Sequence, residues 1–126
     1  MDLVLLSVSG GVGCALRATV RDAARRRGHE PWTTVCVINL LGSAAIGIVL
    51  AAARVHGDGS SHAVTAAVGL LAGWTTYSAF AMDVVQLWWR GDRARAAAIW
   101  MATMFGCPML AWVGAWAVRA AIGGGS

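Results

Sequence analysis

Four side chains near the middle of the sequence, Thr76, Tyr77, Phe80 and Asp83, recur at the helical spacing of three and four residues about Phe80 and share one face if the segment is helical. They supply a hydroxyl, two aromatic rings and a carboxylate. Aromatic rings have positive edges, so hydroxyl donors and ring edges together suit a small anion. Backbone carbonyl groups released at a helix break suit a small cation instead. The residue types therefore predict an ion site and leave the sign of the ion open.

These residues belong to residues 69–83, GLLAGWTTYSAFAMD, where glycines and hydroxyl residues interrupt an apolar run. A membrane tolerates the backbone groups freed by such an interruption only where protein or a wet path surrounds them. The run extends from about Val64 to about Trp89, roughly 26 residues or ~39 Å as helix, against a ~30 Å hydrocarbon core. Thr75 and Thr76 fall near its midpoint. This predicts a broken helix with its break at the depth where transporters place ion sites.

Three further apolar runs join this one in predicting four membrane-crossing helices. The expected spans are about residues 3–20, 32–53, 64–89 and 96–122, within a single four-helix membrane domain over residues 1–126. Hydrophobic residues make up 58% of the chain and charged residues only 13%, which is too few charges to cover a soluble globule. We therefore expect an all-α integral membrane protein without a separate soluble domain. Four such helices alone enclose no water-filled path, so we also expect an oligomer.

The basic residues, all of them arginine, are distributed unequally between the two ends of the predicted spans. Basic loops over residues 21–31 and 90–95 lie at one end, which holds eight arginines when Arg17 is counted, whereas the other end holds Arg54 and Arg119. The positive-inside rule then places both basic loops in the cytoplasm and both termini outside. No extended basic stripe of the kind found in nucleic-acid binders is present.

Two polar side chains inside other spans have two interpretations each. Arg17, near the end of the first span, could snorkel to the membrane interface or could be a cation at the mouth of an anion path. Asn39, in the second span, could make an interhelical hydrogen bond or could donate to a permeating ion. Position alone does not decide the role of Arg17, and for Asn39 it favours the hydrogen bond.

Enzyme chemistry has little support in the sequence. The histidines, His29, His56 and His62, lie in or next to the predicted loops, and no embedded group of His, Cys and carboxylate residues has metal-ligand spacing. A proton-coupled exporter of the small multidrug-resistance type relies on a carboxylate in its first span. Residues 3–20 contain none, which argues against that alternative.

Three motifs in the correct order resemble the CrcB/Fluc family of fluoride channels, and together they cover nearly the whole chain. They are GGVGCALR at residues 10–17, NLLGS at residues 39–43 and GLLAGWTTYSAF at residues 69–80. The third resembles the family segment that breaks the third helix. The resemblance implies an antiparallel dimer with two fluoride pores, in the cell membrane, that releases fluoride passively from the cytoplasm.

The resemblance also implies roles for individual residues. A structural sodium ion at the dimer centre would be held by the backbone carbonyls of Ala72 and Thr75. The expected pore and fluoride residues are Asn39, Thr76, Tyr77, Ser78 and Phe80, with Arg17 and Asp83 in the vestibules. Tyr77 stands where the family has phenylalanine, and Asp83 stands where it usually has glutamate.

A second function stays open beside the conducting channel. The chain could be the partner subunit of a heterodimeric fluoride channel, with its own pore residues degenerate. Val35 stands where the family usually has a pore-lining threonine, and Tyr77 also departs from the family pattern. The arginine bias fixes one orientation, whereas an antiparallel dimer needs both. It therefore favours a homologue of reversed arginine bias as the second subunit over another copy of this chain.

Overall fold

The structure is a computed structural model that describes residues 2–57, 59 and 61–123. Its helices in chain order are α1 Asp2–Arg26, α2 Pro31–His56, α3 His62–Trp74, α4 Tyr77–Trp89 and α5 Arg93–Gly123. Four segments are long and apolar enough to cross a membrane, and α3 with α4 together make up one of them. The predicted all-helical architecture with four apolar spans is therefore confirmed.

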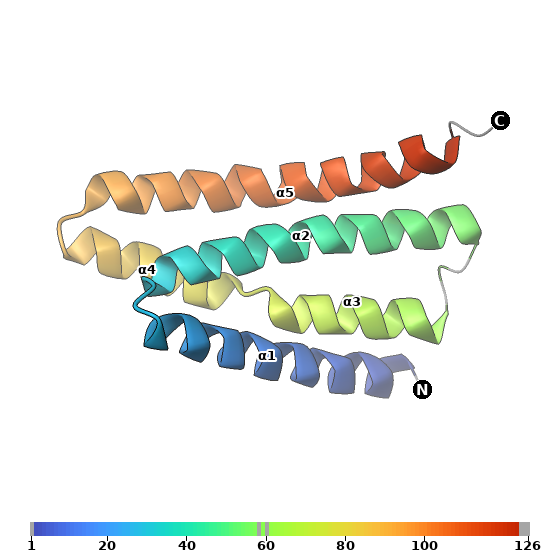
Figure 1. The fold of residues 1–126 in the computed structure, drawn as a ribbon, viewed down its shortest axis with the longest axis horizontal. Coiled ribbons are helices and arrows are strands. Elements are labelled where there is room, and N and C mark those ends of the chain that lie inside the picture. The colour runs from blue at the N-terminus through green and yellow to red at the C-terminus, as the bar shows by residue number, and fades with distance from the viewer. Residues whose placement is uncertain (1, 58, 60, 124–126) are drawn as a thin grey trace.

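The helices are arranged as two pairs (Figure 1). α2 packs along α5 and α1 packs along α3, while α4 contacts α2 and α5. The α1–α2 and α4–α5 connections lie at one end of the bundle, and the start of α1, the end of α5 and the α2–α3 connection lie at the other (Figure 1). The arginines in and beside these two connections therefore share one end.

Glycines allow the two helices of each pair to approach closely. A Cβ atom at Gly13 of α1 would overlap the backbone carbonyl of Leu70 on α3. In the other pair, a Cβ atom at Gly47 of α2 would overlap the carbonyl of Ala111 on α5. Small residues at such positions let helix backbones meet, which is the usual source of packing between helices in lipid.

The helices extend beyond the predicted spans at the basic end. Residues 21–31 are predicted as a loop, but α1 continues to Arg26, so the prediction is wrong for the part that α1 occupies. Residues 21–27 contain no glycine or proline, and the φ of 80° at Gly28 ends the helical path. Pro31 begins α2, where a missing N–H costs nothing. Similarly, α5 already begins at Arg93 within the second predicted loop.

An apolar cluster holds α4 against α2 and α5. Its members are Val35, Phe80, Leu87, Ala96 and Ile99. Phe80 is only 2% exposed and is one of the largest fully buried side chains. Apolar packing therefore fixes the position of α4, the helix that follows the break in the third span.

Large apolar side chains cover much of the outer surface. Val4 is 67% exposed, Phe105 61% and Trp112 67%. Soluble monomers rarely expose such contiguous apolar area, whereas lipid or a second subunit covers it readily. Trp88 and Trp89 are exposed at the basic end, as in an interfacial aromatic belt. The chain is a multi-pass membrane protein.

Candidate functional site

The third apolar segment changes from α3 to α4 at Thr75 and Thr76. Both residues are extended, with φ and ψ of −77° and 153° at Thr75 and −152° and 122° at Thr76. The Thr75 N–H donates to the Leu71 carbonyl at 3.0 Å, which closes α3. The Thr76 hydroxyl accepts from the Ala79 N–H at 3.4 Å and caps α4. The sequence therefore supplies its own end and start signals for the two helices.

The side chain of Asn39 on α2 pairs with the backbone of Thr76. Its Nδ2 donates to the Thr76 carbonyl at 2.9 Å, and its Oδ1 accepts from the Thr76 N–H at 2.8 Å. Asn39 is 5% exposed, so both bonds are formed away from solvent. The amide thus replaces the helical partners that Thr76 lacks. An amide NH2 has two hydrogens, so one remains for another acceptor, and the predicted fluoride contact of Asn39 stays a prediction.

Arg17 on α1 reaches the same break from the opposite pair of helices. Its half-buried guanidinium donates from Nη1 to the Thr75 carbonyl at 3.3 Å. Neither of the two predicted roles for Arg17, snorkelling or vestibule cation, includes this contact. Two separate helices, α1 and α2, therefore bind the two extended residues of the break.

The two carbonyl groups predicted to hold sodium both accept hydrogen bonds within the subunit. The Thr75 hydroxyl donates to the Ala72 carbonyl at 3.3 Å, and Arg17 donates to the Thr75 carbonyl. A carbonyl oxygen has two lone pairs, so each oxygen retains acceptor capacity. Ala72 is exposed on the surface of the subunit, whereas Thr75 is half-buried.

The predicted row of donors and rings differs in burial along its length. Tyr77 is 69% exposed, whereas Phe80 lies in the apolar cluster, yet their ring centroids are 5.6 Å apart at an interplanar angle of 60°. The hydroxyls of Thr76 and Ser78 are 3.3 Å apart. The structure thus brings Asn39, Thr76, Ser78 and the two rings together at the break.

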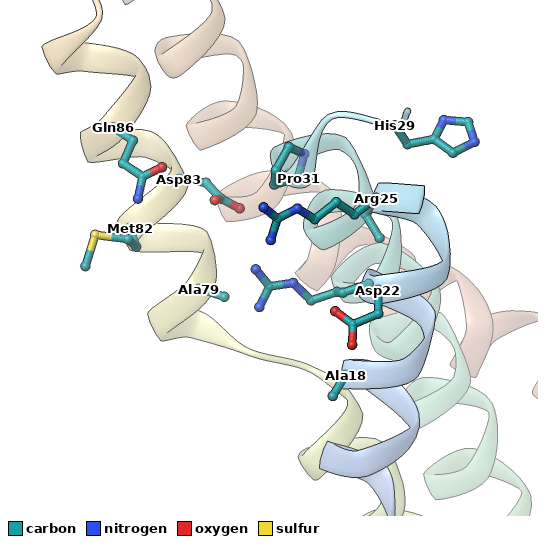
Figure 2. Close-up of a pocket in the computed structure, with 11 residues that line it drawn as sticks. Ala18, Asp22, Arg25, His29, Pro31, Ala79, Met82, Asp83 and Gln86 are labelled. Carbon is teal, nitrogen blue, oxygen red and sulfur yellow. The ribbon is translucent and has the colours of Figure 1, made fainter. Parts of the chain in front are cut away.

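Asp83 faces a different space, a pocket of about 640 Å³ between the C-terminal part of α1 and α4 (Figure 2). Arg21 and Arg25 of α1 line this pocket, and Figure 2 shows the Arg25 side chain extending from α1 toward Asp83 on α4. Asp83 is buried, and in the described part of the chain its Oδ2 has no hydrogen-bond partner. The pocket lies toward the basic end and combines two guanidinium groups with two carboxylates, Asp22 of α1 and the buried Asp83.

The sequence prediction did not include Arg21 and Arg25 among the site residues. A signal for them exists, because Arg17, Arg21 and Arg25 follow one another at intervals of four and so share one face of α1. The prediction of a loop from residue 21 hid this repeat.

Comparison with known proteins gives consistent matches over most of the chain. Residues 4–115 match the family described as CrcB-like protein, Camphor Resistance (CrcB). A protein of Chelativorans sp. (strain BNC1), named Fluoride-specific ion channel FluC, is 38% identical over 120 residues, which cover 93% of this chain and 95% of the relative. A protein of the same name from Mesorhizobium japonicum is 34% identical over 120 residues, 94% of this chain and 96% of the relative. Fluoride-specific ion channel FluC 2 of Nitrobacter hamburgensis is 34% identical over 100 residues, 77% of this chain and 80% of the relative.

Proposed function

The chain belongs to the CrcB family, and from this premise we propose that it forms a fluoride-selective channel that releases fluoride passively from the cytoplasm across the cell membrane. The main structural support is the break at Thr75 and Thr76, where hydrogen-bond donors from α2 and α4 lie near two aromatic rings. A break with its polar backbone held by protein is the arrangement that permits an ion site inside a membrane. The chemistry is permeation and not catalysis.

The residues at the break would replace part of the hydration shell of fluoride. Asn39 offers its second amide hydrogen, and the Thr76 and Ser78 hydroxyls offer donors nearby. The edges of Tyr77 and Phe80 would line the narrowest part with positive charge density. Phe80 is held in the apolar cluster, so its ring edge has a fixed position.

The proposed assembly is an antiparallel dimer in which α3 and α4 together act as one broken membrane-crossing helix. Tyr77, Ser78 and Ala72 are exposed on the single subunit near the middle of this span. Hydroxyl groups, and carbonyl oxygens with an unused lone pair, are costly when they face lipid at that depth. A second subunit that covers this surface removes the cost, which supports an interface there.

The carbonyl oxygens of Ala72 and Thr75 fit a structural sodium ion in this assembly. They are neutral oxygen ligands near the C-terminal end of α3, where the helix macrodipole is negative. Two such residues from each subunit would supply four ligands. When bound, sodium would supply a positive charge that neutralises the oriented carbonyls, and Ala72 and Thr75 would hold it where the two breaks meet.

Fluoride selectivity is the first expected result. Liposomes that contain the purified protein should release fluoride and retain chloride, because the short row of donors and ring edges favours an ion small enough to be contacted from all sides. A fluoride electrode and a chloride electrode on matched liposome preparations measure both fluxes. Empty liposomes are the control, and chloride release at a rate comparable to fluoride release would contradict the proposal.

A second candidate function is a partner subunit that conducts only beside a homologue. Seven or eight arginines at one end against two at the other fix the orientation of this chain, so an antiparallel partner needs the opposite bias. The numbered name FluC 2 of the Nitrobacter relative is in keeping with more than one such chain. Heterodimer formation would also explain why Val35 and Tyr77 are tolerated, since one good pore is then sufficient.

Cysteine labelling in intact cells distinguishes the two assemblies. In a variant without native thiols, Gly59→Cys should be labelled by a membrane-impermeant maleimide, and Ala94→Cys should be labelled only after lysis. Both residues are exposed, and they lie at opposite ends of the bundle. The arginine bias predicts this single orientation.

The positions avoid two glycines that would otherwise suit the experiment. Gly57 and Gly91 have φ of 72° and 84°, where a cysteine would strain the backbone. Near-equal labelling of Gly59→Cys and Ala94→Cys from outside would refute the fixed orientation and support a homodimer of oppositely inserted copies.

A further inference from the structure

The carbonyl oxygen of Thr75 has two candidate cations. One is the guanidinium of Arg17, 3.3 Å away within the same subunit. The other is the sodium ion proposed above, for which Thr75 is a ligand. A carbonyl oxygen has two lone pairs, so it can accept from Arg17 and bind sodium at the same time. The two contacts would, however, bring two positive charges to one oxygen.

Arg17 starts close to the break, because the helix that carries it packs tightly on α3. Gly13, one turn earlier on α1, lies directly against the backbone of Leu70 and Trp74 on α3. This close approach sets the distance between α1 and the end of α3. This backbone packing therefore places Arg17, one turn further along α1, beside the break.

The electrostatic consequence is repulsion between Arg17 and any cation bound at Thr75. Two unit charges about 5 Å apart in an effective dielectric of about 20 repel each other. The repulsion would weaken the binding of a cation on the order of a hundredfold. Rearrangement of the side chain and water reduce this effect, so a change of about tenfold is expected.

We propose that Arg17 is a positioning residue of the helix break, which satisfies the Thr75 carbonyl within one subunit and opposes sodium binding at that oxygen. The inference rests on the sodium site in the proposed function. It also implies that the arginines of α1 have different roles. Arg21 and Arg25 line the open pocket with the carboxylates of Asp22 and Asp83, as Figure 2 shows for Arg25, whereas Arg17 is engaged at the break.

The test measures the melting temperature of the purified dimer against sodium concentration, and the sodium midpoint is the dissociation constant obtained by fitting this rise to one-site binding. N-methyl-D-glucamine chloride replaces sodium chloride, so that chloride and ionic strength stay constant. Arg17→Gln keeps a hydrogen-bond donor and removes the charge, and it should lower the sodium midpoint about tenfold. Arg17→Lys keeps the charge and should stay within about threefold of the natural protein.

Two control variants separate a local effect from a change in total charge. Arg54→Gln removes an exposed charge at the opposite end of the bundle and should leave the sodium midpoint unchanged. Arg21→Gln removes a charge one turn beyond Arg17 and should lower the midpoint by less than about threefold, because the charge is farther from Thr75. Damage to the fold would instead weaken sodium binding and raise the midpoint.

An unchanged or higher midpoint in Arg17→Gln would overturn the inference. A natural protein whose melting temperature does not respond to sodium would overturn it as well. Fluoride efflux from liposomes made with the same preparations reports separately on the proposed function. Fluoride efflux by a protein whose melting temperature does not respond to sodium would support the proposed channel and contradict the competition between Arg17 and sodium.

Discussion

Replacing Asn39 with leucine is expected to abolish fluoride efflux and to lower the free energy of unfolding by about 2–6 kcal/mol. The substitution leaves the N–H and the carbonyl of Thr76 without the partners that Asn39 provides. Each buried polar group left unpaired costs about 1–3 kcal/mol. The break would lose its geometry, and with it the arrangement of donors around the proposed fluoride path. Efflux is measured with a fluoride electrode per amount of folded protein, and stability by denaturant unfolding.

A matched control is available in another buried polar residue. Ser9 on α1 is 8% exposed, and its hydroxyl bonds only within its own helix, to the Leu6 carbonyl at 3.1 Å. Ser9→Ala should therefore change stability by less than about 1 kcal/mol and leave efflux intact. Efflux that persists in Asn39→Leu would show that the amide is dispensable both as a clamp of the break and as a fluoride donor.

Gly13→Val is expected to prevent α1 from packing on α3 and to leave little folded protein. The new side chain would occupy the space of the Leu70 carbonyl, and backbone cannot move aside as a flexible side chain can. Overpacking of this kind costs about 1–3 kcal/mol and more where the backbone must shift. Gly11→Val on the same helix is the control, because a Cβ atom at Gly11 meets nothing within 4 Å in the subunit.

The pair of variants cancels the intrinsic cost of placing valine in a helix, since both residues lie inside α1. The difference between them therefore reports the α1–α3 contact alone. Melting temperature and the elution profile on size exclusion measure the effect. Equal behaviour of the two variants would contradict the close approach of α1 and α3.

Sequence patterns were sufficient for the four apolar helical spans. Apolar runs of membrane-crossing length identify all four spans, and Thr75 and Thr76 end one helix and begin the next through their own caps. Asn39 was also correctly favoured for an interhelical hydrogen bond, since an amide in hydrocarbon requires a partner. These features depend on local composition and on depth in the membrane.

Contacts between distant segments could not be predicted in the same way. Arg17 is 58 positions from Thr75, and the packing of α1 against α3, including that of Gly13, brings the two together. The position of Arg21 and Arg25 beside Asp83 depends on α1 remaining helical to Arg26, which the basic composition of that segment concealed. The burial of Phe80 beneath an exposed Tyr77 likewise follows from tertiary packing against α2 and α5.

The two residues whose hydrogen bonds hold the break, Asn39 and Thr76, are synthesised at different times. Asn39 precedes Thr76 by 37 positions, so α2 leaves the ribosome before the residues that it holds. At about 5–20 residues per second, the Asn39 amide waits roughly 2–7 s for its partner. The amide is therefore already present when Thr76 is made, so the two hydrogen bonds at the break can form while the third span is being inserted.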